Sequence, residues 1–237
     1  MTNQPPVFSP ATVARAMDHA VLKPQYADSD LADHAAMCVA RGVGCLCVRP
    51  SDVAAATRLV AGSPVVVASV VGFPHGSHRP ATKAWEARLA IDDGARELDM
   101  VMAIGRLHSG AESAVHDDIA AVVAAARPQQ VLVKVILETC YLSAEQIVAA
   151  CRLSAAAGAD FVKTSTGFGV NPGGPIGATP EAVRLMLDTV GDRLGVKASG
   201  GIRTWGEAVM YLAMGCRRLG VGDAAAILDG SVSASDY

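Results

Sequence analysis

The chain has 237 residues, of which 51% are hydrophobic and only 4% aromatic, and its formal net charge at pH 7 is −3. This length allows one large α/β domain or two small ones, and the hydrophobic content excludes a disordered chain. The slight negative charge, without a basic run or interleaved aromatic and basic residues, argues against a nucleic-acid-binding protein.

The amino terminus, the apolar segments and the cysteines indicate the cellular compartment of the protein. Residues 1–6 lack the basic and apolar regions of a secretory signal, and the longest apolar stretch, residues 64–71, is too short to cross a bilayer. The cysteines form no CxxC pair, and the histidines show no zinc spacing. We therefore expect a reduced, cytoplasmic protein without a membrane partner.

Short β-branched runs alternate with alanine-rich segments of helical period along the whole chain. The expected strands are residues 17–20, 44–48, 65–71, 97–102, 131–137, 161–164, 195–198 and 218–221, and the expected helices include 30–40, 82–92, 116–126, 144–156, 180–190 and 206–214. Strands and helices that alternate at intervals of roughly 20–35 residues are typical of a (β/α)8 TIM barrel. No linker divides the chain, so we predict one domain over residues 1–237, with a short N-terminal extension and a flexible tail at about 229–237.

Local signals indicate helix starts and a functional loop. Ser143 and Gln146 have the spacing of a capping box, and Thr179 precedes a proline at the first position of the next expected helix. The Gly- and Pro-rich segment 167–178 follows the sixth expected strand. We expect it on the barrel face where loops carry the chemistry.

Lys134, Lys163 and Lys197 each stand in the middle of an apolar strand. A buried ammonium group is costly unless it is paired or loses its charge. Alternation along the strands places these lysines on the inner face of the barrel together with Asp18 and Asp99. A structural ion-pair network that fills the barrel is one explanation. The other is that one lysine has a lowered pKa and acts as an amine nucleophile, for which Schiff-base chemistry is the natural use.

Motifs from end to end of the chain resemble those of the deoxyribose-phosphate aldolase family. They are Met17-Asp18-His19 with Leu22, Cys47 with Pro50, residues 72–76, 97–101, 132–139, 160–167 and 197–203, and the final Tyr237. Each motif alone is weak evidence, but their order and spacing together are specific. The resemblance implies a class I aldolase on a (β/α)8 barrel that works without a cofactor.

The resemblance also implies that Lys163 forms the Schiff base. Only a neutral amine attacks a carbonyl, and we expect burial and the like charge of Lys197 to lower the pKa of Lys163. Asp99 is expected to move protons through a water, and Asp18 to orient the cluster. Tyr237 is expected to reach the site from the tail as a proton carrier. Because the iminium is itself the electron sink, no metal is expected.

Further residues are expected to contact the substrate. Cys47 has the position of a small inward filler, since a nucleophilic role for it lacks a histidine partner. Lys134 lies near the substrate as well, or simply balances the charges of Asp99 and Glu138. The loops after the sixth, seventh and eighth strands supply Thr166, Gly167, Gly200, Gly201, Gly222 and Asp223.

The chain departs from the family pattern where phosphate is expected to bind. Gly222 and Asp223 stand where the family usually has small hydroxyl residues, Ala20 where it often has one, and Phe168 where some members have lysine. The Asp223 carboxylate can cap a short helix at residues 224–228 and repel a phosphate dianion. We therefore expect a relaxed dependence on the substrate phosphate.

The leading prediction is an aldolase that reversibly cleaves 2-deoxy-D-ribose 5-phosphate to acetaldehyde and D-glyceraldehyde 3-phosphate. One alternative is another Schiff-base aldolase or transaldolase-like barrel that acts on a different sugar phosphate. A second alternative is a catalytically silent barrel. The expected ligands are small molecules, and the sequence leaves room for a homo-oligomer.

Overall fold

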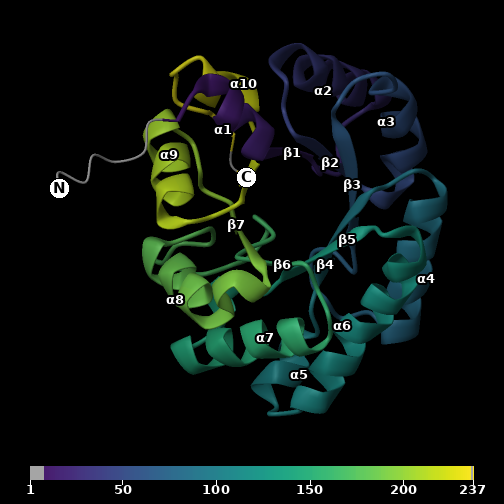
Figure 1. The fold of residues 1–237 in the computed structure, drawn as a ribbon, viewed down its shortest axis with the longest axis vertical. Coiled ribbons are helices and arrows are strands. Elements are labelled where there is room, and N and C mark those ends of the chain that lie inside the picture. Colours follow the sequence, from purple (N-terminus) through teal and green to yellow (C-terminus); the bar gives the residue numbers. More distant parts are fainter. Residues whose placement is uncertain (1–7, 236) are drawn as a thin grey trace.

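The computed structural model describes residues 8–235 and residue 237, so residues 1–7 of the expected N-terminal extension and Asp236 lie outside it. Parallel strands close into a barrel in chain order, β1 to β8 (Figure 1). Their bounds are β1 Met17–Val21, β2 Cys45–Val48, β3 Val66–Val71, β4 Glu97–Val101, β5 Leu132–Ile136, β6 Phe161–Lys163, β7 Gly195–Ser199 and β8 Arg218–Val221. The predicted (β/α)8 barrel is confirmed.

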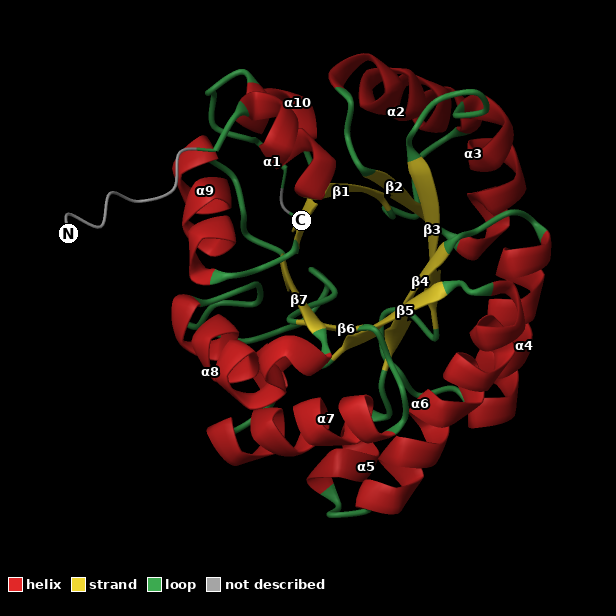
Figure 2. Cartoon of the chain, viewed as in Figure 1, coloured by secondary structure: helices red, strands yellow, loops and turns green. Residues whose placement is uncertain are grey.

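Helices form a ring around the barrel (Figure 2). They are α1 Pro10–Ala16, α2 Asp28–Arg41, α3 Val53–Leu59, α4 Pro80–Asp92, α5 Ile104–His108, α6 Glu112–Ala126, α7 Ala144–Ala156, α8 Pro180–Val190, α9 Trp205–Met214 and α10 Ala224–Leu228, with 3₁₀ turns at Pro50–Asp52, Arg127–Gln129, Thr139–Tyr141 and Gly191–Arg193. Several helices begin earlier than predicted. The first turns of α4 and α6 begin with Pro80 and Glu112, residues that favour the start of a helix. These turns show little of the periodic apolar pattern from which the helices were predicted. No described helix is long and apolar enough to cross a membrane.

The predicted helix caps are present. The Ser143 hydroxyl accepts a hydrogen bond from the Gln146 N–H, and the Gln146 side chain accepts one from the Ser143 N–H at 3.0 Å. The Thr179 hydroxyl accepts from Ala182 N–H ahead of a proline at the first helical position. Each such cap stabilises its helix by about 1 kcal/mol. The start of α8 defines where the long loop after β6 ends.

The apolar core lies between the strands and the surrounding helices. Outward strand residues such as Leu46, Leu98 and Val162 are fully buried there. Burial of each such side chain contributes about 1.5–3 kcal/mol relative to exposure. A second, smaller cluster lies inside the barrel and includes Ala20, Cys47 and Tyr237. The helices therefore supply the main core, which leaves much of the barrel interior to polar side chains.

Candidate active site

Inward-facing charged residues from five strands meet inside the barrel. Strand alternation turns Asp18, Asp99, Lys134, Lys163 and Lys197 inward, as predicted, and each is at most 1% exposed. The strand register places Lys163 beside Lys197, and Asp99 beside Lys134. All five side chains therefore join one cluster.

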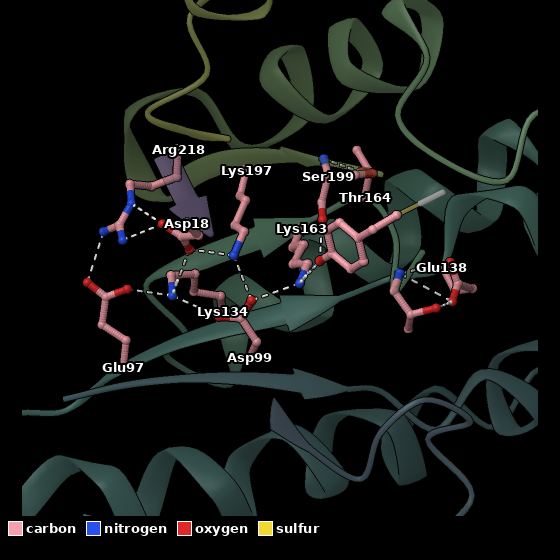
Figure 3. Close-up of polar contacts among 12 residues, drawn as sticks. Asp18, Glu97, Asp99, Lys134, Glu138, Lys163, Thr164, Lys197, Ser199 and Arg218 are labelled. Atoms are coloured by element: carbon pink, nitrogen blue, oxygen red, sulfur yellow. Dashed lines mark hydrogen bonds and ion pairs between the residues drawn. The ribbon is translucent and has the colours of Figure 1, made fainter. Parts of the chain in front are cut away.

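Asp99 lies at the centre of the cluster (Figure 3). Its Oδ1 accepts a hydrogen bond from Nζ of Lys134 at 2.7 Å. Its Oδ2 accepts from Nζ of Lys163 at 2.8 Å and from Nζ of Lys197 at 2.7 Å. Burial would raise the pKa of this carboxyl group, but the three ammonium groups, Lys134 foremost, hold it well below the ordinary value. Asp99 is thus a carboxylate shared by all three lysines.

Two further charged residues, Glu97 and Arg218, complete the cluster and were missed by the sequence analysis. Glu97 lies 2.5 Å from Nζ of Lys134 and accepts from Arg218 at 2.9 Å. Arg218 also donates to Asp18, which in turn accepts from Lys197. Both residues could have been found, because Glu97 is two positions from Asp99 on one strand and Arg218 begins the eighth strand.

Lys134 pairs with Asp99, as expected, and with two carboxylates that were not expected. Besides Asp99 and Glu97, its Nζ lies 3.4 Å from Asp18. These charges outweigh the effect of burial and raise the pKa of Lys134 well above its ordinary value. The described ion pairs of Lys134 do not include Glu138, so that part of the expectation is wrong.

The pKa of Lys163 differs from the predicted direction. Burial would lower the pKa of this ammonium group, but the Asp99 carboxylate outweighs burial and raises the pKa above its ordinary value. The prediction of a lowered pKa is therefore wrong for this arrangement. The like charge of Lys197 would lower the pKa of Lys163. Both lysines, however, donate to the same Asp99 oxygen, and the negative charge there has the larger effect.

The ion pairs still distinguish Lys163 from the other two lysines of the cluster. If every group is ionised, the cations Lys134, Lys163, Lys197 and Arg218 exceed the carboxylates Asp18, Glu97 and Asp99 by one charge. Lys134 contacts three of these carboxylates and Lys197 contacts two, whereas Lys163 contacts only Asp99. Loss of the excess proton from Lys163 leaves the cluster neutral and breaks the fewest ion pairs.

A metal ion does not fit among the carboxylates. Within the described chain, Asp18, Cys45 and Glu97 are close enough together to form a ligand set. Lys134 and Arg218 already neutralise the two carboxylates. Burial, with the nearby carboxylates, also raises the pKa of the Cys45 thiol well above its ordinary value, which disfavours the thiolate that metals bind.

Comparison with known proteins agrees with this geometry. The sequence model described as "DeoC/LacD family aldolase" matches residues 12–216. The chain belongs to this aldolase family. A deoxyribose-phosphate aldolase of Nocardia farcinica is 50% identical over 93% of this chain and 95% of its own length. One of Carboxydothermus hydrogenoformans is 43% identical over 98% of this chain and 100% of its own length.

Solved structures give the same family. A putative deoxyribose-phosphate aldolase from Coccidioides immitis superposes with a TM-score of 0.88 at 39% identity, over 94% of this chain and 87% of that one. A deoxyribose phosphate aldolase from Aeropyrum pernix, whose title describes a unique tetrameric structure, has a TM-score of 0.85 at 30% identity, over 93% of this chain and 91% of that one.

In this aldolase the tail residue Tyr237 lies against the lysine cluster. Its hydroxyl lies 3.4 Å from Nζ of Lys163 and 3.1 Å from the Ser199 hydroxyl. Its side chain is buried, and its main-chain oxygen accepts a hydrogen bond from Gly201 N–H at 3.3 Å. A Cβ atom on Gly167 would lie 2.8 Å from the tyrosine ring, so only glycine leaves room for this ring.

Three of the residues predicted to contact the substrate are glycines in the loops that follow β6 and β7. Gly167, Gly200 and Gly201 all have φ between 75° and 83°, a region that other residues rarely adopt. Thr166 is buried beside Glu138, and both its hydroxyl and its N–H donate hydrogen bonds to the Glu138 carboxylate. Cys47 packs inside the barrel, where burial raises the pKa of its thiol to about 11, so it is a neutral filler at neutral pH.

The remaining predicted contacts surround the last strand. A Cβ on Gly222 would overlap Ser235 of the tail. Oδ1 of Asp223 accepts a hydrogen bond from Ala226 N–H at 3.0 Å, which confirms the expected cap of α10. Gly222, Asp223 and Ser235 border a cavity of about 370 Å³.

A separate cavity of about 200 Å³ lies at the barrel mouth. Its walls include Ala20, Lys23, Gly167, Phe168 and Tyr237. Tyr237 both lines this cavity and contacts Lys163, so the tyrosine links the cavity to the amine. A larger cavity of about 630 Å³ lies outside the barrel, around the segment that precedes α4, and does not include the lysine cluster.

Proposed function

We propose that this aldolase reversibly cleaves 2-deoxy-D-ribose 5-phosphate to acetaldehyde and D-glyceraldehyde 3-phosphate through a Schiff base on Lys163. The supporting observation is the contact pattern within the cluster: of its three lysines, Lys163 is the one with a single described carboxylate partner, and it contacts the Tyr237 hydroxyl. Relatives with this activity in their names, at 43–50% identity over nearly the whole chain, support the substrate.

The reaction follows from the chemistry of a neutral lysine. The neutral Lys163 amine adds to the substrate aldehyde, and loss of water together with return of one proton from Asp99 forms a protonated imine. Cleavage of the C2–C3 bond sends its electron pair into the imine, giving an enamine, while the C3 hydroxyl loses its proton and leaves as the aldehyde of glyceraldehyde 3-phosphate. Protonation of the enamine carbon and hydrolysis of the resulting imine release acetaldehyde and restore the amine.

We assign the proton transfers to Asp99 and Tyr237. Asp99 contacts Nζ of Lys163 and can accept its proton, directly or through a water, before the attack. Tyr237 contacts Lys163 through its hydroxyl and lines the cavity of about 200 Å³, which we take as the substrate entry, so its hydroxyl is the group proposed to protonate the enamine carbon. Lys197 and Asp18 are positioning residues that hold the charge of Asp99 in place.

Reduction with borohydride in the presence of acetaldehyde tests the proposal. A class I aldolase gains a stable ethyl adduct, and peptide mapping should place it on Lys163. An adduct on Lys134 or Lys197 would contradict the assignment, and absence of any adduct would favour the silent barrel. Turnover of deoxyribose 5-phosphate in EDTA, measured beside other sugar phosphates, separates the proposed substrate from those of related Schiff-base aldolases.

We also propose that the enzyme is a homo-oligomer. The tetramer named for the relative from Aeropyrum pernix supports this assembly. Light scattering on the purified full chain gives the mass directly. A mass of 24.3 kDa, that of one chain, at the concentration of the activity assay would contradict it.

A further inference from the structure

Glu138 is a buried carboxylate beside the lysine cluster that the proposed mechanism does not use. It follows β5, is 1% exposed, and makes no ion pair within residues 8–235 and 237. Its φ and ψ of 58° and 64° lie in the left-handed region that residues other than glycine rarely adopt. Such a conformation persists only where surrounding contacts fix it, and it is common at functional sites.

The strongest side-chain contacts of Glu138 come from the loop after β6, beside a weak one from Cys140 Sγ to Oε1 at 4.0 Å. Its Oε1 and Oε2 accept hydrogen bonds from Thr166 N–H at 3.1 and 3.3 Å, and Oε2 also accepts one from the Thr166 hydroxyl. The Thr166 hydroxyl oxygen in turn accepts from Phe168 N–H at 2.9 Å. A single carboxylate therefore orders both N–H groups that flank Gly167.

The loop packs closely against the Glu138 side chain. A Cβ on Gly169 would lie 2.8 Å from Sγ of Cys140 and 3.5 Å from the Glu138 carboxyl carbon. Just beyond, Val170 N–H donates to the Tyr141 hydroxyl at 2.8 Å. Residues 138–141 thus hold residues 166–170 at successive points, and the Glu138 carboxylate is the one charged group among these contacts.

The loop segment 166–170 also supports Tyr237. The Tyr237 ring lies directly against the bare Cα of Gly167, and its hydroxyl is 3.4 Å from Nζ of Lys163. Displacement of Gly167 therefore moves the ring, while Lys163 keeps its place in β6 and its contact with Asp99. Among the described contacts, Glu138 makes no hydrogen bond or ion pair with Lys163, so its effect on that amine is limited to the longer-range attraction between the two charges.

We infer that Glu138 is a positioning residue for proton transfer: it fixes the turn at residues 166–168 so that Gly167 holds the Tyr237 hydroxyl over Lys163. The inference rests on the proposed function. Glu138 therefore contributes to protonation of the enamine. Formation of the imine depends on Lys163 and Asp99 instead.

Glu138→Gln tests this role because it keeps the size of the side chain and removes its charge. An amide cannot accept from both Thr166 donors without leaving a buried N–H group unpaired, so the turn loosens. We expect borohydride trapping of acetaldehyde on Lys163 to stay within about twofold of wild type. Exchange of the acetaldehyde methyl protons with deuterated water should slow by about 10²-fold, the size of effect that a small misplacement produces. Glu145→Gln, an exposed change on α7, is the matched control and should alter neither rate.

The same substitution in a Tyr237→Phe background distinguishes positioning from general stability. If Glu138 acts through the Tyr237 hydroxyl, the second substitution slows exchange by less than about twofold further. A full additional loss, or normal exchange in the single variant, would overturn the inference. If Glu138→Gln does not fold, Thr166→Val reports on the same link and must show the same dependence on Tyr237. Failure of the wild-type enzyme to trap acetaldehyde would instead reject the proposed function.

Discussion

Nζ of Lys163 lies 2.8 Å from Oδ2 of Asp99 and donates a hydrogen bond to it. The carboxylate stabilises the ammonium form and, despite burial, raises the pKa of Lys163. A lysine held in this form cannot attack a carbonyl until its proton leaves. In the mechanism that we propose, the acceptor of that proton is the same carboxylate, so Asp99 both stabilises the ammonium form and takes its proton.

Asp99→Asn should separate these two effects. Loss of the negative charge lowers the pKa of Lys163, so borohydride trapping of acetaldehyde should reach its half-maximum at a lower pH than in wild type. Turnover should nevertheless fall by about 10²–10⁴-fold, because the proton acceptor is gone. Asp118→Asn removes a carboxylate from the other buried lysine pair, that with Lys83, and should leave the trapping profile in place. An unshifted profile or a normal kcat would contradict the role of Asp99.

Lys197→Met should have the opposite effect on the amine. Lys197 donates to the same Asp99 oxygen as Lys163, at 2.7 Å. Without it, that oxygen interacts with Lys163 alone, so the pKa of Lys163 rises further. Each unit of increase reduces the neutral amine at pH 7 about tenfold. Trapping at pH 7 should therefore fall by at least that factor and recover as the pH is raised. Trapping that is weak at every pH would indicate misfolding instead, and circular dichroism is the check.

The inner face of the barrel could be predicted because strand side chains alternate with a period of two. That rule placed Asp18, Asp99 and the lysines together before any geometry was known. It applies equally to Glu97 and Arg218, because the two strands were predicted to begin at these residues, so both could have been included. The pKa of Lys163 could not be predicted, since it depends on which oxygen each ammonium reaches.

The tail shows a different limit of sequence-based prediction. Its serine-rich composition is typical of a flexible end, and only the family resemblance pointed to Tyr237. In the structure the Tyr237 ring fills the space that Gly167 leaves. Its hydroxyl forms hydrogen bonds with the Lys163 ammonium group and the Ser199 hydroxyl. Such long-range complementarity between a chain end and a loop has no local pattern in the sequence.

Tyr237→Phe should leave imine formation intact and slow protonation. The ring still fills the space against Gly167, and only the hydroxyl near Lys163 is lost. We expect methyl-proton exchange of acetaldehyde to slow by about 10²-fold, at the lower end of the range for a proton donor, with trapping on Lys163 preserved. Nuclear magnetic resonance in deuterated water measures the exchange. Equal exchange in the two proteins would show that the enamine takes its proton from another group.

His19 should make the fold sensitive to acid. Its Nε2 lies 2.8 Å from Nδ1 of His34, and its Nδ1 accepts a hydrogen bond from Ala224 N–H, so the ring is neutral. Burial foremost, and then His34, lowers its pKa to about 3, whereas the unfolded chain has the ordinary value of 6.5. The unfolded state therefore binds the proton first as the pH falls. The contribution to stability is complete above pH 6.5 and is lost progressively toward pH 3.

The magnitude can be checked with urea unfolding of His19→Gln, which keeps an acceptor for Ala224 but does not titrate. The wild-type free energy of unfolding should fall by about 1.4 kcal/mol per pH unit below 6.5 through this group alone. The variant should lack that part of the slope, so the two curves converge as the pH falls from 7.5 to 4.5. Parallel curves would show that His19 takes up its proton in the folded state.

Asp223 should weaken recognition of the substrate phosphate. Its carboxylate caps α10 through Ala226 N–H and borders the cavity beside Gly222, so a negative charge of the protein occupies the region where the substrate phosphate is expected. Repulsion between the two anions should reduce the preference of the enzyme for phosphorylated over free deoxyribose. Measurement of kcat/KM on both sugars gives this preference directly.

Asp223→Ser should increase the preference, because serine still caps the helix and replaces the charge with a hydroxyl donor. The gain in binding of the phosphorylated sugar is expected to be about 1–3 kcal/mol, the scale of a hydrogen bond to a charged group, and should lower KM for that sugar only. Asp223→Ala removes the repulsion without adding a donor, so it should give part of the gain and lower the free energy of unfolding by about 1 kcal/mol through loss of the cap. A wild-type enzyme that strongly prefers the phosphorylated sugar, with a ratio that neither substitution alters, would place the phosphate away from Asp223.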